Sequence, residues 1–339
     1  MPGMDIGIDL GTTTVEIYMS GKGIVLKEPS VVAVNTKTDE ILAVGEEAYR
    51  MLGRTPSYIN AIRPLKDGVI SDHEMTEFMI KDFLKKVCGS LMIKPRVSIC
   101  VPSAITDVES RAVTQAAVSA GARKVYLLEE PIAAAIGAGI DISQPNGQMV
   151  VDIGGGTTDV AVISLSGVVV SRSLRVAGNH FEEEIIRYLL NTYKVLIGER
   201  MAEKIKIEIG CVFNPDKNVT AEIKGRHQLK GLPQRVTVSQ AELYEPLKNQ
   251  AMKIVEVIKS VLDVTPPELG GDIYTNGIVL TGGGSLIQGL PALIESETRV
   301  KVRIADDPMD CVAIGTGKSF DYLDNLQQGF SDMVTYSHE

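Results

Sequence analysis

The stretch that decides the fold reads Met149-Val150-Val151-Asp152-Ile153-Gly154-Gly155-Gly156-Thr157-Thr158-Asp159-Val160-Ala161-Val162. An apolar strand ends in an acidic residue, and a glycine turn, two hydroxyl side chains and a second apolar strand follow. Three glycines without Cβ atoms let backbone amides point inward, and such a nest of donors suits a phosphate. Asp152 would repel a bare phosphate, which indicates a Mg²⁺ ion between them, held through retained waters. An ordinary hairpin with a glycine loop is the alternative interpretation.

The same pattern occurs a second time near the beginning of the chain. It reads Ile6-Gly7-Ile8-Asp9-Leu10-Gly11-Thr12-Thr13-Thr14-Val15-Glu16-Ile17. The distance between the two copies is far too long for the repeat of a solenoid, and it favours two related halves. Two such hairpins that face each other across a cleft would hold one polyphosphate between them.

A third glycine turn follows another apolar strand late in the chain. It reads Leu280-Thr281-Gly282-Gly283-Gly284-Ser285-Leu286, in which a triglycine turn leads into the start of a helix. A glycine turn at a helix N-terminus admits the close approach of a ligand, so this segment is a third candidate nucleotide contact. Taken alone it is a weak indication, since many strand-to-helix turns contain glycine.

Composition bounds the classes of protein to which the chain can belong. With 339 residues, 44% hydrophobic and 23% charged, it is long enough for two well-packed lobes. The net charge of −9 disfavours sequence-independent binding of nucleic acid. Its four cysteines have no metal-ligand spacing, which argues against structural zinc or a disulfide framework. No apolar run approaches the ~20 residues of a membrane span, and no signal peptide precedes the first strand, so we expect a cytoplasmic protein.

Strands and helices alternate along the chain in a way that favours a mostly parallel sheet covered by helices. Glu129 and Glu130 stand at the entrance of a small apolar helix that begins at Pro131. Four pairs of residues are typical of helix N-caps: Ser71 with Glu74, Thr106 with Glu109, Asn179 with Glu182, and Ser239 with Glu242.

The three glycine motifs, in this order and spacing, resemble those of the actin, sugar-kinase and heat-shock-chaperone ATPase superfamily. Within it the chain is similar to the bacterial actin homologues of the MreB/Mbl family, from about Asp5 to Leu326. The segments that carry this likeness are Gly23-Ile24-Val25-Leu26-Lys27-Glu28-Pro29-Ser30-Val31-Val32-Ala33, Ala43-Val44-Gly45-Glu46-Glu47-Ala48, Arg63-Pro64-Leu65-Lys66-Asp67-Gly68-Val69-Ile70, Glu130-Pro131-Ile132-Ala133-Ala134-Ala135-Ile136-Gly137-Ala138-Gly139, Ile197-Gly198-Glu199-Arg200 and Cys311-Val312-Ala313-Ile314-Gly315-Thr316-Gly317.

The resemblance implies an α/β, actin-like fold with two RNase-H-like lobes, each carrying a small inserted subdomain, and a nucleotide cleft between them. Lobe I would span residues 1–140, with its insertion at about 33–70. Lobe II would span residues 141–326, with its insertion at about 180–238. A last helix, from Pro308 to about Leu326, would pack back on lobe I, and residues 327–339 would form a tail.

The resemblance also implies a role for each residue that matches a family motif. Asp9 and Asp152 would hold the hydrated Mg²⁺, while Glu130 would orient the attacking water with help from Thr157. The contacts to ATP would be Gly11, Thr12, Thr13, Gly154, Gly155, Gly156 and Thr157 around the phosphates, Gly178 and Asn179 near the ribose, Glu203 and Lys206 near the adenosine, and Gly282, Gly283, Gly284, Ser285 and Leu286 at the base.

Two of these assignments carry a qualification. In the first phosphate loop, Thr13-Thr14 stands where the family usually has Ala-Asn. Because backbone amides do most of the binding there, nucleotide binding is expected to survive, with altered affinity or turnover. For Glu203 and Lys206 the alternative is a solvated helix face in a charged stretch.

The function implied by the resemblance is that of a filament-forming ATPase with slow hydrolysis that maintains rod shape. It would lie on the inner face of the cell membrane. Its partners would be copies of itself, in homopolymeric filaments of paired protofilaments, together with the membrane surface and the cell-wall elongation machinery. A small-molecule kinase and a non-polymerising ATPase of the same fold remain alternatives. A chaperone would need a peptide-binding domain, for which the residues beyond Leu326 are too few.

Three apolar residues, Leu91-Met92-Ile93, stand in a connection where polar turn residues are expected. They would either pack into the core or remain exposed. Members of the MreB/Mbl family bind membrane through an apolar loop at this place, sometimes with an N-terminal amphipathic helix. Met1-Pro2-Gly3 directly precedes the first strand here, so the loop is expected to suffice.

Overall fold

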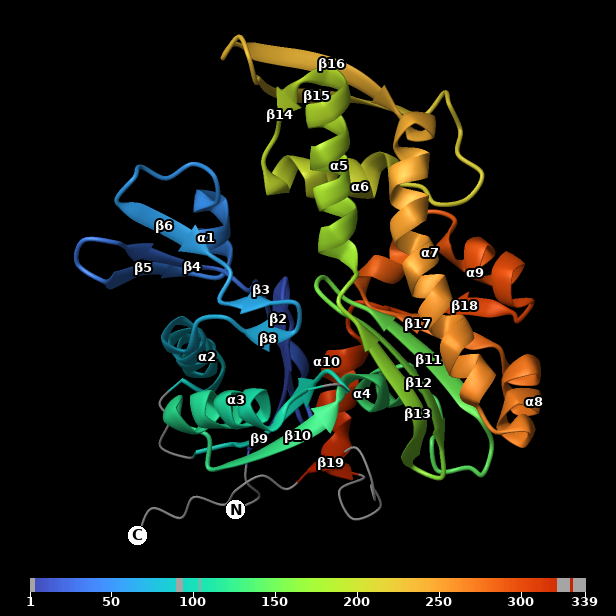
Figure 1. Cartoon of the computed structure of the whole chain (residues 1–339). Helices are drawn as coiled ribbons and strands as arrows, with labels where there is room; N and C mark the ends of the chain where they lie inside the picture. Colours follow the sequence, from blue (N-terminus) through green and yellow to red (C-terminus); the bar gives the residue numbers. More distant parts are fainter. Residues whose placement is uncertain (1–3, 90–93, 104, 322–329, 332–339) are drawn as a thin grey trace.

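The computed structural model describes residues 4–89, 94–103, 105–321 and 330–331 of the chain. These residues form two lobes, each built around a β-sheet and each extended by a smaller inserted unit. Figure 1 shows lobe I at the left and lobe II at the right, with both inserted units toward the top.

The sheet of lobe I has the strand order β19-β10-β9-β1-β2-β3. Its central strands run parallel, whereas β2, β3 and β19 are antiparallel to their neighbours. The sheet is therefore mixed, and the prediction of a mostly parallel sheet is wrong for its edges. The strands are β1 (Asp5–Leu10), β2 (Thr14–Met19), β3 (Gly23–Pro29), β9 (Arg96–Val101), β10 (Lys124–Glu129) and β19 (Phe330–Ser331).

Helices cover both faces of this sheet. On one face lie α2 (His73–Cys88) and α3 (Asp107–Ser119), and the buried Phe83 of α2 belongs to the same apolar cluster as Ile8 and Val97 of the strands. On the other face lie α4 (Glu130–Gly137) and α10 (Cys311–Lys318). These two helices approach so closely that a Cβ on Gly315 would stand 1.8 Å from the carbonyl oxygen of Ala133.

The insertion of lobe I is a three-stranded sheet, ordered β5-β4-β6, with one short helix. Its small core contains Val31, Ala43 and Ala48. A two-stranded ribbon returns the chain to the lobe. The elements are β4 (Val32–Asn35), β5 (Glu40–Val44), α1 (Glu46–Met51), β6 (Ile59–Ile62), β7 (Leu65–Lys66) and β8 (Val69–Ile70).

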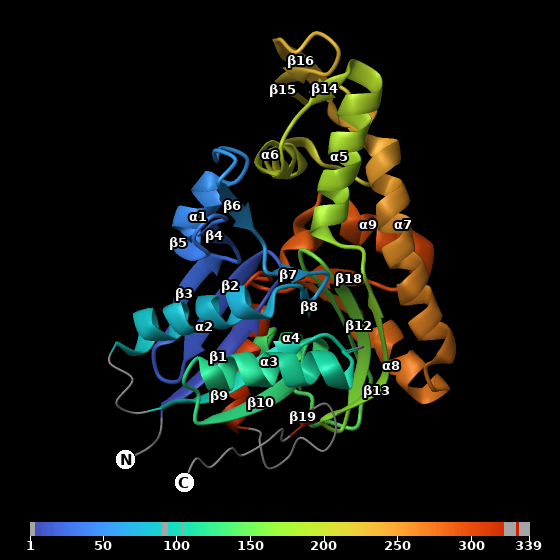
Figure 2. The same ribbon diagram turned by 60° about the vertical axis from the view of Figure 1, so that its left-hand side comes forward.

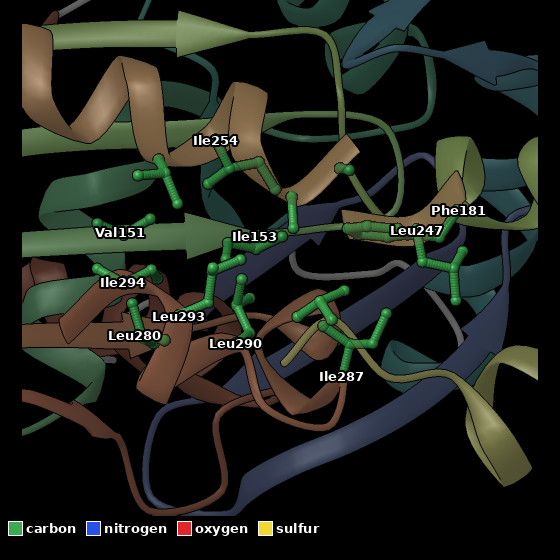
Figure 3. Packing of buried hydrophobic residues seen from close by; sticks show 14 of the residues in the cluster. Val151, Ile153, Phe181, Leu247, Ile254, Leu280, Ile287, Leu290, Leu293 and Ile294 are labelled. Atoms are coloured by element: carbon green, nitrogen blue, oxygen red, sulfur yellow. The ribbon is translucent and has the colours of Figure 1, made fainter. Parts of the chain in front are cut away.

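The sheet of lobe II has the order β13-β12-β11-β17-β18 and is also mixed. The long helix α7 (Gln240–Val264) and α9 (Leu290–Thr298) pack on one face, where Ile254 and Leu293 meet Val151 and Leu280 (Figure 3). The remaining elements are β11 (Gln148–Ile153), β12 (Thr158–Ser164), β13 (Gly167–Leu174), α8 (Pro267–Asn276), β17 (Ile278–Thr281) and β18 (Val302–Ile304).

The insertion of lobe II consists of two helices and a three-stranded sheet ordered β14-β15-β16. The face of α5 carries Phe181, Ile185 and Leu189 into the core shared with α6 and α7. The elements are α5 (Gly178–Tyr193), β14 (Val195–Leu196), α6 (Glu199–Ile209), β15 (Thr220–His227) and β16 (Pro233–Ser239).

Two of the four predicted helix caps are present. The amide of Glu109 donates to the Thr106 hydroxyl, and the Glu242 carboxylate accepts from the amide and hydroxyl of Ser239. The prediction for Ser71 is wrong, because the N-cap of α2 is Asp72, whose side chain accepts the amide of Met75 at 3.1 Å. The prediction for Asn179 is wrong, because α5 begins at Gly178 with Ala177 as its N-cap.

The last helix differs from its predicted extent. It begins at Cys311 rather than Pro308, and a 3₁₀ turn over Ser319–Asp321 follows its end at Lys318. The Pro308 carbonyl instead accepts the amide of Gly282 at 2.7 Å. The rest of the predicted helix lies outside the described residues. Although α10 follows lobe II in the chain, it packs against β1 and α4 of lobe I.

Candidate functional site

Each lobe presents a hairpin in which an acidic residue at the end of the first strand faces a second acid across the ladder. Asp9 of β1 pairs in register with Glu16 of β2, and Asp152 of β11 pairs with Asp159 of β12. The repeated geometry agrees with two related halves. Glu16 and Asp159 are buried, and sequence analysis gave them no role. Their equal spacing after the first acid was the signal that could have singled them out.

The two hairpins border one cavity of about 430 Å³ between the lobes. This volume lies within the usual range for small-ligand sites. The residues predicted from sequence that line it are Asp9, Gly11, Thr12, Thr13, Glu130, Asp152, Gly154, Gly155, Gly156, Thr157, Gly178, Asn179, Glu203, Lys206, Gly282, Gly283, Gly284 and Leu286.

Ser285 is the predicted site residue that the described cavity lining does not include. Its side chain is buried, and its hydroxyl donates to the carbonyl oxygen of Gly282 at 2.6 Å. This bond holds the 3₁₀ turn Gly283–Leu286 and so shapes the loop rather than facing the cavity.

The first glycine loop is held by contacts with both lobes. The amide of Gly68 donates to the Thr12 hydroxyl at 3.0 Å within lobe I. The Thr13 hydroxyl donates to Oδ1 of Asn179 at 3.3 Å, and Asn179 stands in the first turn of α5 in lobe II. The threonine that departs from the usual family pattern therefore bonds across the cleft.

The second glycine loop leaves no room for side chains at two positions. A Cβ on Gly155 would lie 1.9 Å from the Thr13 hydroxyl oxygen, and one on Gly156 would lie 2.7 Å from that of Thr12. Two carbonyls of the loop are bound by the start of α5, since Gly154 and Gly155 accept the amides of Gly178 and Asn179. These bonds fix the start of α5 against the loop.

Three carboxyl groups that influence one another line the cavity. Burial, followed by the Glu16 carboxylate, raises the pKa of Asp9 to about 8. Burial raises the pKa of Asp152 to about 7, against a hydrogen bond that it accepts from Thr281 at 2.6 Å. Burial and the nearby Asp159 hold the pKa of Glu130 well above its usual range. The pKa of each of these carboxyls is raised on balance, and a bound cation would stabilise their charged forms.

The donor set fits a magnesium ion held through water. Asp9 and Asp152 supply hard oxygen donors from opposite lobes of the cavity. The described part of the chain contains no group of three acidic, histidine or cysteine side chains that could ligate a metal together. Mg²⁺ commonly keeps several waters and takes one or two carboxylates together with phosphate oxygens, so two acids are sufficient.

Glu203 and Lys206 of α6 lie at the cavity wall and are both engaged. Lys206 Nζ is 2.6 Å from the Glu182 carboxylate of α5. Glu203 accepts a hydrogen bond from the Tyr49 hydroxyl of lobe I. Neither residue therefore has the freely solvated side chain of the alternative interpretation.

Sequence analysis missed several further lining residues, among them Ile207, Met309 and Gly68. Ile207 has 75% of its surface exposed although it is apolar, and it stands among charged residues of α6, out of step with the buried face. Met309 follows Pro308, and Gly68 lies in the β7–β8 turn. An isolated apolar residue on a charged helix face could have marked Ile207 as a ligand contact. Nothing in the sequence marks Met309 and Gly68, which only the fold brings to the cavity.

A comparison with family models decides the relationship. The model of the MreB/Mbl protein family matches residues 3–328. The chain belongs to the MreB/Mbl family. The cell shape-determining protein Mbl of Bacillus subtilis (strain 168) is 53% identical over 323 residues, covering 95% of this chain and 97% of that protein. The cell shape-determining protein MreB of Escherichia coli (strain K12) is 48% identical, with 94% of each chain covered.

Solved structures of similar shape confirm the predicted actin-like fold for this MreB/Mbl family member. MreB5 of Spiroplasma citri bound to ADP superposes with a TM-score of 0.89 at 39% identity, covering 95% of this chain and 97% of that one. The same protein bound to AMPPNP gives 0.88 at 38% identity, covering 96% and 98%. The MamK double helical filament gives 0.79 at 24% identity, covering 94% and 98%, and supports the fold alone.

The predicted membrane-binding residues Leu91, Met92 and Ile93 lie outside the described residues. Among the helices that the structure does describe, none has the length and apolar character needed to cross a bilayer.

Proposed function

We propose that this MreB/Mbl family member binds ATP with Mg²⁺ in the cleft between its lobes and hydrolyses it slowly. The observation that carries the proposal is the pair of matching hairpins, which bring two glycine loops and two acids to one cavity. Spiroplasma citri MreB5 supports the proposal, because its structures contain bound ADP or AMPPNP and its ADP-bound chain is 39% identical in sequence to this one.

Each group around the cavity has a task in this proposal. Mg²⁺, when bound, would neutralise phosphate charge and bridge it to the protein, with Asp9 and Asp152 holding its water shell. Amides of the two glycine loops would wrap the phosphates. Glu130, at the entrance of α4, would orient a water for attack, assisted by Thr157. Exposed apolar surface of Ile207, Leu286 and Met309 at the cavity wall suits a purine base.

Equilibrium binding of a fluorescent ATP analogue, with Mg²⁺ and with excess chelator, tests the proposal. We expect binding to require Mg²⁺, and equal affinity in both conditions would reject the metal-bridged site. Phosphate release that depends on an added sugar or other small acceptor would favour the kinase alternative.

We further propose head-to-tail assembly, on the grounds that the β15–β16 turn and α8 lie at opposite ends of lobe II (Figure 1) and differ in the charge of the residues around them. The β15–β16 turn exposes Leu229 by 81% and Leu232 by 62%. Basic residues flank these leucines: Lys224, Arg226, Lys230 and Arg235.

The opposite end of lobe II exposes apolar groups among acids. Leu165 in the β12–β13 turn is 64% exposed, and Tyr274 of α8 is 70% exposed. Residues 260–277 contain three acidic side chains and no lysine or arginine. A contact between unlike, opposite ends repeats from copy to copy and produces an open filament when its rotation does not close into a ring. Charge complementarity would set its orientation.

Leu229→Asp is expected to raise the concentration needed for ATP-dependent pelleting by roughly tenfold or more, since burial of one leucine contributes about 1.5–3 kcal/mol. High-speed sedimentation over a range of protein concentrations measures this. Val108→Asp is the matched control, because Val108 is 76% exposed on α3 of lobe I. Unchanged pelleting of Leu229→Asp, or an equal loss in the control, would remove the β15–β16 turn from the interface.

We also propose that the filaments lie on the inner face of the cell membrane and organise cell-wall synthesis. The cell shape-determining relatives support the cellular role. Insertion of Leu91 and Met92 would contribute about 3–6 kcal/mol per subunit before the cost of immobilisation is subtracted. Linked insertions along a filament would then make binding strong through avidity.

Leu91→Asp combined with Met92→Asp is therefore expected to abolish flotation with liposomes while ATP-dependent pelleting without lipid persists. The control is wild-type protein below its assembly concentration, which should float weakly. A double variant that floats like the wild type would place the membrane anchor elsewhere.

A further inference from the structure

A cluster of polar side chains crosses the cleft between the two insertions, where Figure 2 shows α1 beside α6. The hydroxyl of Tyr49, on α1 of lobe I, donates to Oε2 of Glu203, on α6 of lobe II, at 2.5 Å. The guanidinium of Arg200, also on α6, lies 4.9 Å from the centroid of the Tyr49 ring. One tyrosine of lobe I is therefore held by both an anion and a cation of lobe II.

Arg63 connects this cluster to the first glycine loop. Its Nη1 donates to the carbonyl oxygen of Thr13 at 3.2 Å, and its guanidinium lies 6.0 Å from the Tyr49 ring centroid. Its Nε is also 3.9 Å from the Glu199 carboxylate, whose side chain is 63% exposed. Because exposed ion pairs contribute little, the bond to Thr13 and the contact with the ring are the stronger attachments.

The Tyr49 hydroxyl stays protonated at physiological pH. Burial and the Glu203 carboxylate raise the pKa of Tyr49 to about 12, so its hydroxyl keeps the proton that it donates. Hydrogen bonds to a charged acceptor are stronger than bonds between neutral groups, and both side chains here are partly buried.

We propose that Tyr49, Arg63, Arg200 and Glu203 form an interlobe clasp that slows the release of nucleotide from the cleft. The inference rests on the nucleotide binding proposed above. Glu203 lines the cavity, whereas Tyr49 stands behind it, so Tyr49 is a positioning residue that acts through Glu203. Opening of the clasp frees α6 from α1, and through Arg63 it also removes a support of the loop at Thr13.

Tyr49→Phe is expected to increase the dissociation rate of a fluorescent ATP analogue roughly tenfold and to leave its association rate unchanged. Stopped-flow displacement by excess unlabelled ATP in the presence of Mg²⁺ measures the release. Tyr58→Phe is the matched control, because Tyr58 belongs to the same insertion and its ring packs against Lys37. Equal release rates for Tyr49→Phe and the wild type would overturn the proposal.

A double-mutant cycle separates the clasp from a general loss of structure. If Tyr49 acts through Glu203, adding Tyr49→Phe to Glu203→Gln should accelerate release by clearly less than it does in the wild type. Independent effects that multiply would show that the two residues act separately.

Hydrogen exchange without nucleotide provides a readout that does not depend on binding. Tyr49→Phe should speed amide exchange in the first turn of α6, in the opposite lobe, while Tyr58→Phe should not. If the faster exchange in Tyr49→Phe were confined to α1, Tyr49 would have only a local structural role and the clasp would be rejected. If the wild-type protein retained no analogue, the proposed nucleotide binding would fail, and the exchange result would still decide whether the clasp exists.

Discussion

Replacement of Asp152 by alanine is expected to weaken the binding of Mg-ATP by about 10- to 100-fold, the range found when groups around a metal's first ligands are removed. Asp152 faces the cavity from the second hairpin and is the acid of lobe II predicted to hold the ion's water shell. Without it, the charge of the triphosphate loses its bridge to that lobe. Equilibrium titration with a fluorescent ATP analogue at fixed Mg²⁺ measures the change.

Two further variants make this result specific. Asp152→Asn keeps an acceptor for the Thr281 hydroxyl but removes the charge, so it should lose affinity about as much as the alanine variant. Glu74→Ala removes an exposed acid from α2, outside the cavity lining, and should bind like the wild type. An asparagine variant with normal affinity would mean that the Asp152 charge holds no ion.

Replacement of Glu130 by alanine is expected to slow hydrolysis on the order of 10²-fold while nucleotide affinity stays near the wild-type value. The side chain lines the cavity at the start of α4, and a carboxylate there can orient a water without being needed to hold phosphate. Single-turnover phosphate release at saturating Mg-ATP measures the rate, and the binding titration measures the affinity.

The neighbouring residue offers the matched control for this variant. Glu129 precedes Glu130 as the N-cap of α4 and lies outside the cavity lining. Glu129→Ala should therefore release phosphate at close to the wild-type rate. If Glu129→Ala is the slow variant and Glu130→Ala is not, the water-orienting role belongs to Glu129.

The parts of the site that sequence analysis identified are those whose chemistry is local. Glycines at 155 and 156 are required because any side chain there would meet a threonine hydroxyl, and the glycine pattern is visible in the sequence. Asp9 and Asp152 lie near the ends of apolar strands, directly before the glycine turns. The length of each strand and the position of its turn therefore place the acid at the cavity. The caps at Thr106 and Ser239 bond within four residues of chain.

The cap predicted at Asn179 fails because of contacts between distant segments. Asn179 has the residue type of an N-cap, but the amides of Gly178 and Asn179 are bound by the carbonyls of the glycine loop, and the helix therefore begins earlier. The Asn179 side chain bonds to Thr13 of the other lobe instead. Glu182, its presumed capping partner, pairs with Lys206 of α6.

The sequence by itself determined the two hairpins, their glycine loops, the order of the elements and the family, because backbone preferences and apolar periodicity act over short distances. Only the tertiary structure decided which polar groups meet across the cleft. Thr13 bonds to Asn179 and Tyr49 bonds to Glu203 because packing of α4 and α10 between the two sheets sets how the lobes face each other. No local pattern encodes these pairs, since each joins residues more than 150 positions apart in the chain.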